Sequence, residues 1–170
     1  MNTRRATVTA LMAALVFLGT YIFKIPSPFG GYAHLGDCMI ILSVCLLGTG
    51  HAVLAAAIGA GLADLLGGYM IWVVPTAVIK GVWALLMGLF MYRILKNMKF
   101  GWLTGAVIGG LVQIVLYTIV KIPLYGQYGA LAEVPLLAGQ TVCGIVFGSV
   151  LYLIFEKSSV LGRLQRLCRG

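Results

Sequence analysis

Long apolar runs take up most of this chain and leave little room for any other kind of segment. Six of them, separated by short breaks, cover residues 6–23, 36–47, 52–66, 73–95, 102–120 and 134–155. A helix needs about 20 apolar residues to cross the hydrocarbon core of a membrane. The 170 residues, 61% of them hydrophobic, suffice for one such domain (1–170) and for no separate soluble one. The sequence therefore predicts an all-α integral membrane bundle of six transmembrane helices.

For the first apolar run the question is whether it is cleaved as a signal peptide, and for the second it is where the helix begins. The first follows a short basic N-terminus, as in a signal peptide, but it is longer than a usual signal core. Lys24-Ile25-Pro26 then stands where a small-residue cleavage site would be expected, so we predict a retained helix. The second run is short, and we expect its helix to draw on residues before Gly36.

Two segments rich in proline, glycine and aromatic residues interrupt the apolar pattern. Residues 24–33 read K-I-P-S-P-F-G-G-Y-A, and residues 122–133 read I-P-L-Y-G-Q-Y-G-A-L-A-E. Proline and glycine oppose a regular helix, so both segments are predicted to be irregular loops. The first, with Phe29 and Tyr32, could fold over a cavity as a lid or serve as a plain connector.

Lysine and arginine gather on one side of the predicted bundle. That side holds Arg4, Arg5, Arg93, Lys96, Lys99, Lys157, Arg163, Arg166 and Arg169, whereas the other holds Lys24 and Lys121. Basic residues mark the cytoplasmic side of a membrane protein, so both termini are predicted to be cytoplasmic. This distribution explains the net charge of +8 without a nucleic-acid partner.

The polar side chains of the predicted bundle fall toward its outer half, while the inner half is apolar and rich in glycine. A charge inside the membrane is costly unless it faces a cavity or a partner. The predicted substrate-binding residues are Tyr32, His34, Asp64, Lys80, Trp83, Gln113, Tyr117, Glu133 and Gln140. A chamber that is polar on one side only suits a receptor for a small solute taken from outside, rather than a through-channel.

Several of these side chains also have a purely structural interpretation. Lys80 could contact a ligand or pair with Asp64 inside the protein. Glu133 could accept a hydrogen bond from a ligand or be a solvated loop acid at the rim. Gln113 and Gln140 need hydrogen-bond partners, which a ligand or another helix could supply.

The aromatic side chains, and two residues at the start of the second helix, also have both a ligand-binding and a structural interpretation. Five aromatic side chains could stack on a flat ligand ring, pack inside the protein or anchor it at the membrane interface. They are Trp72, Trp83, Tyr117, Tyr125 and Tyr128. His34 and Asp37 could simply cap the second helix.

Alanines recur at four-residue spacing in two of the predicted helices. Ala6, Ala10 and Ala14 form a small-residue stripe on the first helix, where another helix of this chain or of a partner could approach closely. In the third helix a similar alanine face, which starts at Ala52, ends at Asp64.

Motifs for common catalytic chemistry are missing from the sequence. It has no G-x-x-x-x-G-K-[ST] phosphate loop, so the chain is not expected to hydrolyse ATP. Its cysteines form no C-x-x-C pair, and no metal-ligand spacing joins them to His34 or His51. No nucleophile and base stand together, so we expect no enzymatic activity and no cofactor.

These features resemble those of the substrate-binding S components of energy-coupling factor (ECF) vitamin transporters. The closest local matches are H-L-G-D at 34–37, I-G-A-G-L-A-D-L-L-G-G-Y at 58–69, P-T-A-V-I-K-G at 75–81 and L-A-G-Q-T-V-C-G at 137–144. The alanine stripe of the first helix matches the family's small-residue motif. The resemblance covers nearly the whole chain and points to the branch of riboflavin, pyridoxine and hydroxymethylpyrimidine carriers.

The resemblance implies a division of labour between subunits. The chain would capture a vitamin from outside and dock through its alanine stripe on a transmembrane, EcfT-like coupling subunit that carries two ATP-binding subunits. It would then topple in the membrane to deliver the vitamin inward. From the residues alone, a self-sufficient small-solute permease is the alternative.

Overall fold

Six α-helices make up most of the structure, a computed structural model that describes residues 3–27, 32–158, 162 and 165. They are α1 (Thr3–Tyr21), α2 (Gly36–Leu47), α3 (Thr49–Leu66), α4 (Val73–Leu89), α5 (Gly101–Ala132) and α6 (Val134–Lys157). A 3₁₀ turn, η1 (Met70–Trp72), precedes α4, and a π-helical turn, η2 (Phe90–Ile94), follows it. The predicted all-α fold is confirmed. Four predicted features, Phe29 of the first loop and the C-terminal Arg163, Arg166 and Arg169, lie outside the described residues.

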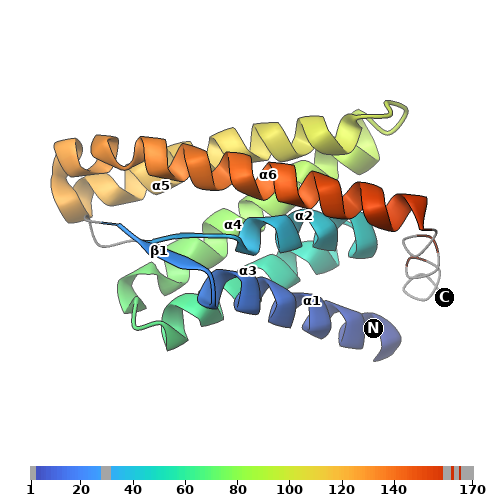
Figure 1. The fold of residues 1–170 in the computed structure, drawn as a ribbon, viewed down its shortest axis with the longest axis horizontal. Coiled ribbons are helices and arrows are strands. Elements are labelled where there is room, and N and C mark those ends of the chain that lie inside the picture. The colour runs from blue at the N-terminus through green and yellow to red at the C-terminus, as the bar shows by residue number, and fades with distance from the viewer. Residues whose placement is uncertain (1–2, 28–31, 159–161, 163–164, 166–170) are drawn as a thin grey trace.

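The helices form an elongated bundle (Figure 1). The long helices α5 and α6 run along one side, α1 lies on the opposite side, and α2, α3 and α4 lie between them. The start of α1 and the end of α6 lie at one end of the bundle. Among the described residues, α3, the α4 region, α5 and α6 are long and apolar enough to cross a membrane, whereas α2 is shorter.

The segment predicted as the first irregular loop contains a short hairpin. Strand β1 (Lys24–Pro26) pairs antiparallel with β2 (Tyr32–His34), with Lys24 opposite His34. Because β2 ends directly before α2, the helix draws on no residue before Gly36, and that prediction was wrong. Helix α2 can be short because nearly all its side chains are buried by the surrounding helices rather than exposed to lipid.

The prediction that residues 122–133 form an irregular loop was also wrong in detail, because this segment is mainly helical. Helix α5 continues through Pro123 to Ala132, with one break at Gly126, where φ is 76° and ψ is 167°. That left-handed backbone conformation suits glycine and lets the chain change direction without a longer loop. The final turn of α5 thereby places Glu133 beside Lys121 of the same helix.

Glycines allow the helices of the bundle to approach closely. A side chain at Gly109 would overlap the ring of Trp83, so α5 can contact α4 only because this residue is glycine. In the same way, a side chain at Gly144 of α6 would overlap Asp37 of α2. These contacts bring polar side chains from different helices within hydrogen-bonding distance.

Candidate functional site

A buried polar network joins four helices in the interior of the bundle. The ammonium nitrogen of Lys80 lies 2.5 Å from Asp37 Oδ1 and 2.7 Å from Gln113 Oε1. The amide of Gln113 donates to the Thr141 hydroxyl at 2.9 Å, and that of Gln140 donates to Asp37 Oδ2 at 3.0 Å. The network thus compensates two charges that would be costly in the membrane interior, and it links α2, α4, α5 and α6.

The partner of Lys80 differs from the prediction. The sequence offered Asp64 or a ligand as the partner of Lys80, but the structure pairs Lys80 with Asp37, which lies in the first turn of α2. Trp83, another predicted site residue, is buried in the core and donates its indole N–H to the Ala106 carbonyl at 3.0 Å. Lys80, Trp83 and Gln113 therefore belong to the interior and do not line the pocket described below.

A second buried ion pair lies closer to the hairpin. Lys121 of α5 pairs with Glu133, and Ser27, just after β1, donates to the same carboxylate. Lys121 is 4% exposed and Glu133 is 2% exposed. Glu133 is therefore not the solvated loop acid that was one of its two interpretations from the sequence, and the pair connects the hairpin to the junction of α5 and α6.

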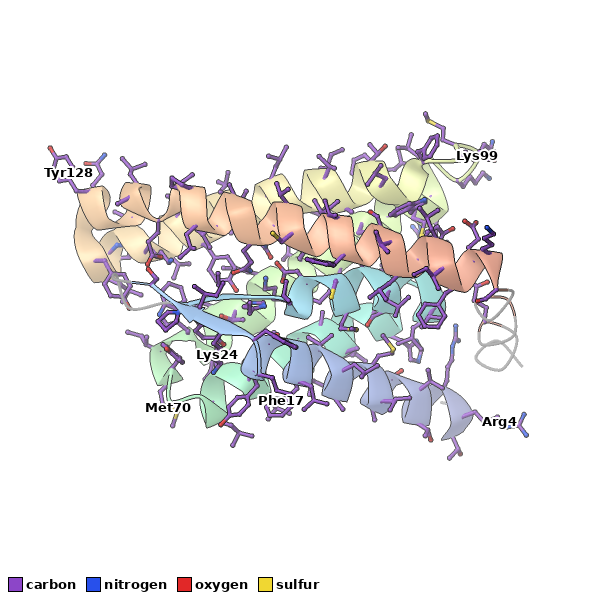
Figure 2. All side chains as sticks on the ribbon, in the orientation of Figure 1. Arg4, Phe17, Lys24, Met70, Lys99 and Tyr128 are labelled. Carbon is purple, nitrogen blue, oxygen red and sulfur yellow. The ribbon has the colours of Figure 1, made fainter. Side chains whose placement is uncertain are left out.

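A small pocket lies between the hairpin and the adjacent ends of α3 to α6. Its volume is about 40 Å³, and its lining comprises Tyr32, His34, Asp64, Tyr69, Trp72, Thr76, Tyr117, Lys121, Leu137 and Gln140. We call it the hairpin pocket. In Figure 2, Lys24 of the hairpin and Met70 of η1 lie at this end of the molecule, and Arg4 and Lys99 lie at the opposite, basic end. Five predicted residues line the pocket: Tyr32, His34, Asp64, Tyr117 and Gln140.

Aromatic rings form much of the pocket wall. The ring centroids of Tyr32 and Tyr69 are 4.7 Å apart, and those of Trp72 and Tyr117 are 6.0 Å apart. Such rings offer flat apolar area to a planar ligand. Trp72 is only 5% exposed, so it is not the interface anchor that sequence reasoning also allowed. Tyr128, by contrast, is 92% exposed and lies away from the pocket.

His34 presents a neutral imidazole to the pocket. The backbone N–H of Gly36 donates to His34 Nδ1 at 3.1 Å, which leaves the ring proton on Nε2. Burial, together with the nearby charge of Lys80, lowers the pKa of His34 to about 3, so the ring carries no charge at neutral pH. Its Nε2 lies 3.4 Å from the Gln140 amide nitrogen, which is itself a donor to Asp37.

Asp64 places a carboxylate in the same pocket. The Tyr32 hydroxyl donates to its Oδ1, which ties the hairpin to the end of α3. Its Oδ2 is buried, and the side chain of Thr76 is a further hydrogen-bond partner of the carboxylate. The pocket therefore brings a carboxylate and a neutral imidazole to one cavity.

Sequence reasoning did not select every residue of the pocket. Thr76 lies one helical turn before Lys80, and Lys121 lies one turn after Tyr117, so helical spacing from a selected residue could have indicated both. Leu137 carries no comparable signal, because it is one leucine among many in an apolar helix.

Comparisons with known proteins agree with this description. The family model described as "ECF-type riboflavin transporter, S component" matches residues 1–157. The chain belongs to this family. It is therefore an S component of an ECF transporter, a multi-pass protein of the cell membrane and not an enzyme. Membership implies a vitamin-type substrate and an ECF module as partner.

Individual relatives give the same picture. A protein of Pyrococcus woesei described as "Uncharacterized protein in gap 3'region" is 36% identical over 143 residues, or 84% of this chain and 95% of the relative. The thiamine precursor transporter HmpT of Lactococcus lactis subsp. cremoris (strain MG1363) is 29% identical over 167 residues, or 97% of this chain and 95% of the relative. The solved S component of a bacterial ECF transporter matches with a TM-score of 0.66 at 21% identity, over 94% of this chain and 97% of that chain. The last comparison establishes the shared fold.

The alanine stripe of this S component faces outward. Ala10 and Ala14 are exposed, whereas α1 packs into the bundle through Met12, Ala13 and Val16. The stripe lines an apolar groove of about 490 Å³ between α1 and α3, which we call the alanine groove. The alternative that the stripe serves packing within the chain therefore does not apply to Ala10 and Ala14.

Proposed function

We propose that this S component binds its vitamin in the hairpin pocket and delivers it through an ECF module that docks in the alanine groove. The observation that carries the proposal is the chemistry of the pocket. Aromatic walls, the buried carboxylate of Asp64 and the neutral imidazole of His34 meet in one small cavity. A few polar groups among apolar rings are the usual composition of a site for a flat heterocycle.

The predicted site residues have two roles under this proposal. Tyr32, His34, Asp64, Tyr117 and Gln140 contact the vitamin, because they line the pocket. The interior network around Lys80 holds Gln140 in place through their shared partner Asp37. Gln113 and Trp83 then hold in place the interior helices that carry pocket residues, and Glu133 stabilises the pocket through its contacts with Lys121 and the hairpin.

The descriptions of the relatives fit a small aromatic vitamin. The family model is described by riboflavin, and the Lactococcus relative by a thiamine precursor. Riboflavin, pyridoxine and hydroxymethylpyrimidine, the candidates from the sequence, all contain a flat ring that aromatic walls could hold.

The proposed partner of the alanine groove is a transmembrane, EcfT-like coupling subunit that carries two ATP-binding subunits. The groove is almost entirely apolar, and small residues along α1 allow a partner helix to approach closely. The groove lies between α1 and α3, and α1 lies on the opposite side of the bundle from α5 and α6 (Figure 1). The vitamin pocket and the proposed docking surface therefore involve different residues and can be tested separately.

Calorimetry on the purified protein in lipid nanodiscs tests the pocket. We expect Trp72→Ala and Tyr117→Ala each to weaken vitamin binding at least about tenfold, equivalent to about 1.4 kcal/mol. Tyr128→Ala is the matched control, because that aromatic ring is exposed and outside the pocket, and it should bind like the wild type. Unchanged affinity in both pocket variants would mean that the vitamin binds elsewhere.

A further inference from the structure

A continuous series of side-chain contacts joins the alanine groove to the hairpin. Phe17 lines the groove, and its ring stacks on that of Tyr21 one helical turn later, with centroids 5.3 Å apart and planes 17° from parallel. The centroid of the Tyr21 ring in turn lies 4.6 Å from the ammonium of Lys24. Lys24 belongs to strand β1, and Figure 2 shows it at the same end of the molecule as Phe17.

Three tyrosine rings surround the Lys24 ammonium. Besides Tyr21 of α1, it lies 4.5 Å from the centroid of Tyr32 in β2 and 5.2 Å from that of Tyr69, just before η1. A side chain at Gly67 would overlap the ammonium, so the cation also lies at the C-terminus of α3, where the helix dipole favours it. Among the described residues no carboxylate lies within ion-pair distance of Lys24. Cation–π contacts therefore tie the hairpin to α1 and to the end of α3.

The same tyrosines border the hairpin pocket. Tyr32 and Tyr69 line it, and the Tyr32 hydroxyl donates to Asp64. The pocket volume is about 40 Å³, which holds about three or four waters at about 10–15 Å³ each. A vitamin therefore needs more room than the pocket now has. The other walls are ends of helices packed in the bundle, so the hairpin is the wall that moves most readily, and the contacts of Lys24 restrain that movement.

Phe17 is the residue of α1 that a docked helix would disturb. Of the side chains that α1 contributes to the alanine groove, Phe17 is the largest, and it follows Ala14 by about one helical turn. A partner helix that comes close to the alanines therefore meets the Phe17 ring and has to displace it. Displacement separates this ring from Tyr21, which is 42% exposed and has no helix above it to hold its position on Lys24.

Resting on the function proposed above, we propose that docking in the alanine groove loosens the hairpin through Phe17, Tyr21 and Lys24. A docked helix shifts the Phe17 ring, Tyr21 loses its stacking partner, and the Lys24 ammonium loses one of its three rings. The hairpin then opens more often. The vitamin is thereby held while the S component is alone and exchanges faster once the ECF module has docked.

Amide hydrogen exchange of the hairpin tests these contacts in the lone chain and needs no vitamin. In nanodiscs, Tyr21→Leu should speed exchange in β1 and β2 about two- to fivefold, as expected for the loss of one exposed cation–π contact. Phe17→Ala should act in the same direction, although Phe17 is not part of the hairpin. The double variant should add little to Tyr21→Leu, because both changes act through the Tyr21 ring. Fully additive effects, or unchanged exchange in either single variant, would overturn the proposal.

Phe147→Ala is the matched control for Phe17→Ala. Phe147 is 52% exposed on α6 and lines neither the alanine groove nor the hairpin pocket. Its removal should leave hairpin exchange at the wild-type rate. Equal acceleration in Phe147→Ala would show that the loss of any surface ring loosens the hairpin, and the specific role of Phe17 would be wrong. Phe17 is half-buried and Tyr21 is exposed, so both variants are expected to fold.

The assembled complex tests the link to docking. In wild-type protein assembled with its ECF module in nanodiscs, β1 and β2 should exchange faster than in the lone chain, and Phe17→Ala should reduce that difference. The two proposals fail in distinguishable ways. If Ala10→Trp prevents assembly but hairpin exchange is the same or slower in the wild-type complex, the docking site is right and the link to the hairpin is wrong. If Ala10→Trp assembles normally, the groove is not the docking site and both proposals fail.

Discussion

The ammonium of Lys80 lies 2.5 Å from Asp37 Oδ1, and both side chains are fully buried. This pair joins α2 to α4, two helices that also contact each other in the bundle. Gln113 and Gln140 add hydrogen bonds to the two charged groups, so both are compensated without a ligand. Lys80 therefore links α2, α4 and α5 in the interior of the bundle.

We predict that separating this pair destabilises the protein. Lys80→Met leaves the Asp37 carboxylate buried without a cation, and the loss of one partner of a buried pair costs about 3–5 kcal/mol. Thermal unfolding in detergent should show a clearly lower midpoint for this variant. Lys99→Met, at an exposed lysine of the basic end, should unfold like the wild type.

A double variant separates the effect of the unpaired charge on stability from the effect of lost side-chain packing. Because two apolar side chains of similar size leave no unpaired charge, Lys80→Met with Asp37→Leu should recover part of the lost stability. A single Lys80→Met protein that is as stable as the wild type but has lost vitamin affinity would instead make Lys80 a ligand-binding residue.

The Lys121–Glu133 pair supports a second stability prediction. Glu133→Gln removes the charge that compensates Lys121 and weakens the hydrogen bond from Ser27, so the contact between hairpin and α5 should loosen. We expect a lower unfolding midpoint and faster proteolysis within the hairpin. Ser27→Ala should have a smaller effect on unfolding, because it removes one neutral donor and leaves the ion pair. Equal midpoints for Glu133→Gln and the wild type would contradict this view of the pair.

The sequence predicted the helices better than it predicted the partners of their charges. Alanine spacing in α3 correctly indicated a buried helix face, because small residues at one-turn intervals permit close contact whatever the neighbouring helix is. The face of α3 that carries Ala52, Ala56 and Ala60 is fully buried, as expected. The spacing of small residues along a helix and their size are local properties that can be read directly from a single sequence.

Partner choice, in contrast, depends on contacts between distant segments. Asp64 precedes Lys80 by a short turn, so proximity along the chain favoured it, but packing of α2 in the centre of the bundle brings Asp37 to Lys80 instead. Similarly, the sequence placed Lys121 on the outer side of the bundle but did not identify its partner. The break at Gly126 brings Glu133 beside Lys121, and a contact of this kind depends on the path of the chain in three dimensions.

His34 gives a prediction for the dependence of stability on pH. Burial lowers its folded-state pKa to about 3, against about 6.5 in an unfolded chain. Between these values the unfolded state binds one more proton, so the stability that comes from the neutral ring is fully present above pH 6.5 and is lost as the pH falls towards 3. From pH 6.5 to pH 5 the loss should approach about 2 kcal/mol.

Unfolding at pH 7 and pH 5, compared with His34→Asn, isolates this contribution. Asparagine does not titrate in that range, so the variant should lose less stability between the two pH values than the wild type loses. The acids contribute equally to both proteins and cancel in the comparison. The same pH sensitivity in both proteins would show that His34 is not buried as a neutral ring.

Ala10 provides the sharpest test of the alanine groove. A tryptophan at this exposed position would fill the groove and hold a partner helix away from α1, with loss of many close contacts. The hairpin pocket uses different residues, so Ala10→Trp should keep wild-type vitamin affinity in nanodiscs and lose uptake in cells that express the complete ECF module. Leu11→Trp is the matched control, since Leu11 is 58% exposed on the same helix but does not line the groove. Equal loss of binding and uptake in Ala10→Trp would assign the stripe to the fold of the S component, and uptake by the lone wild-type chain in liposomes would make it a permease.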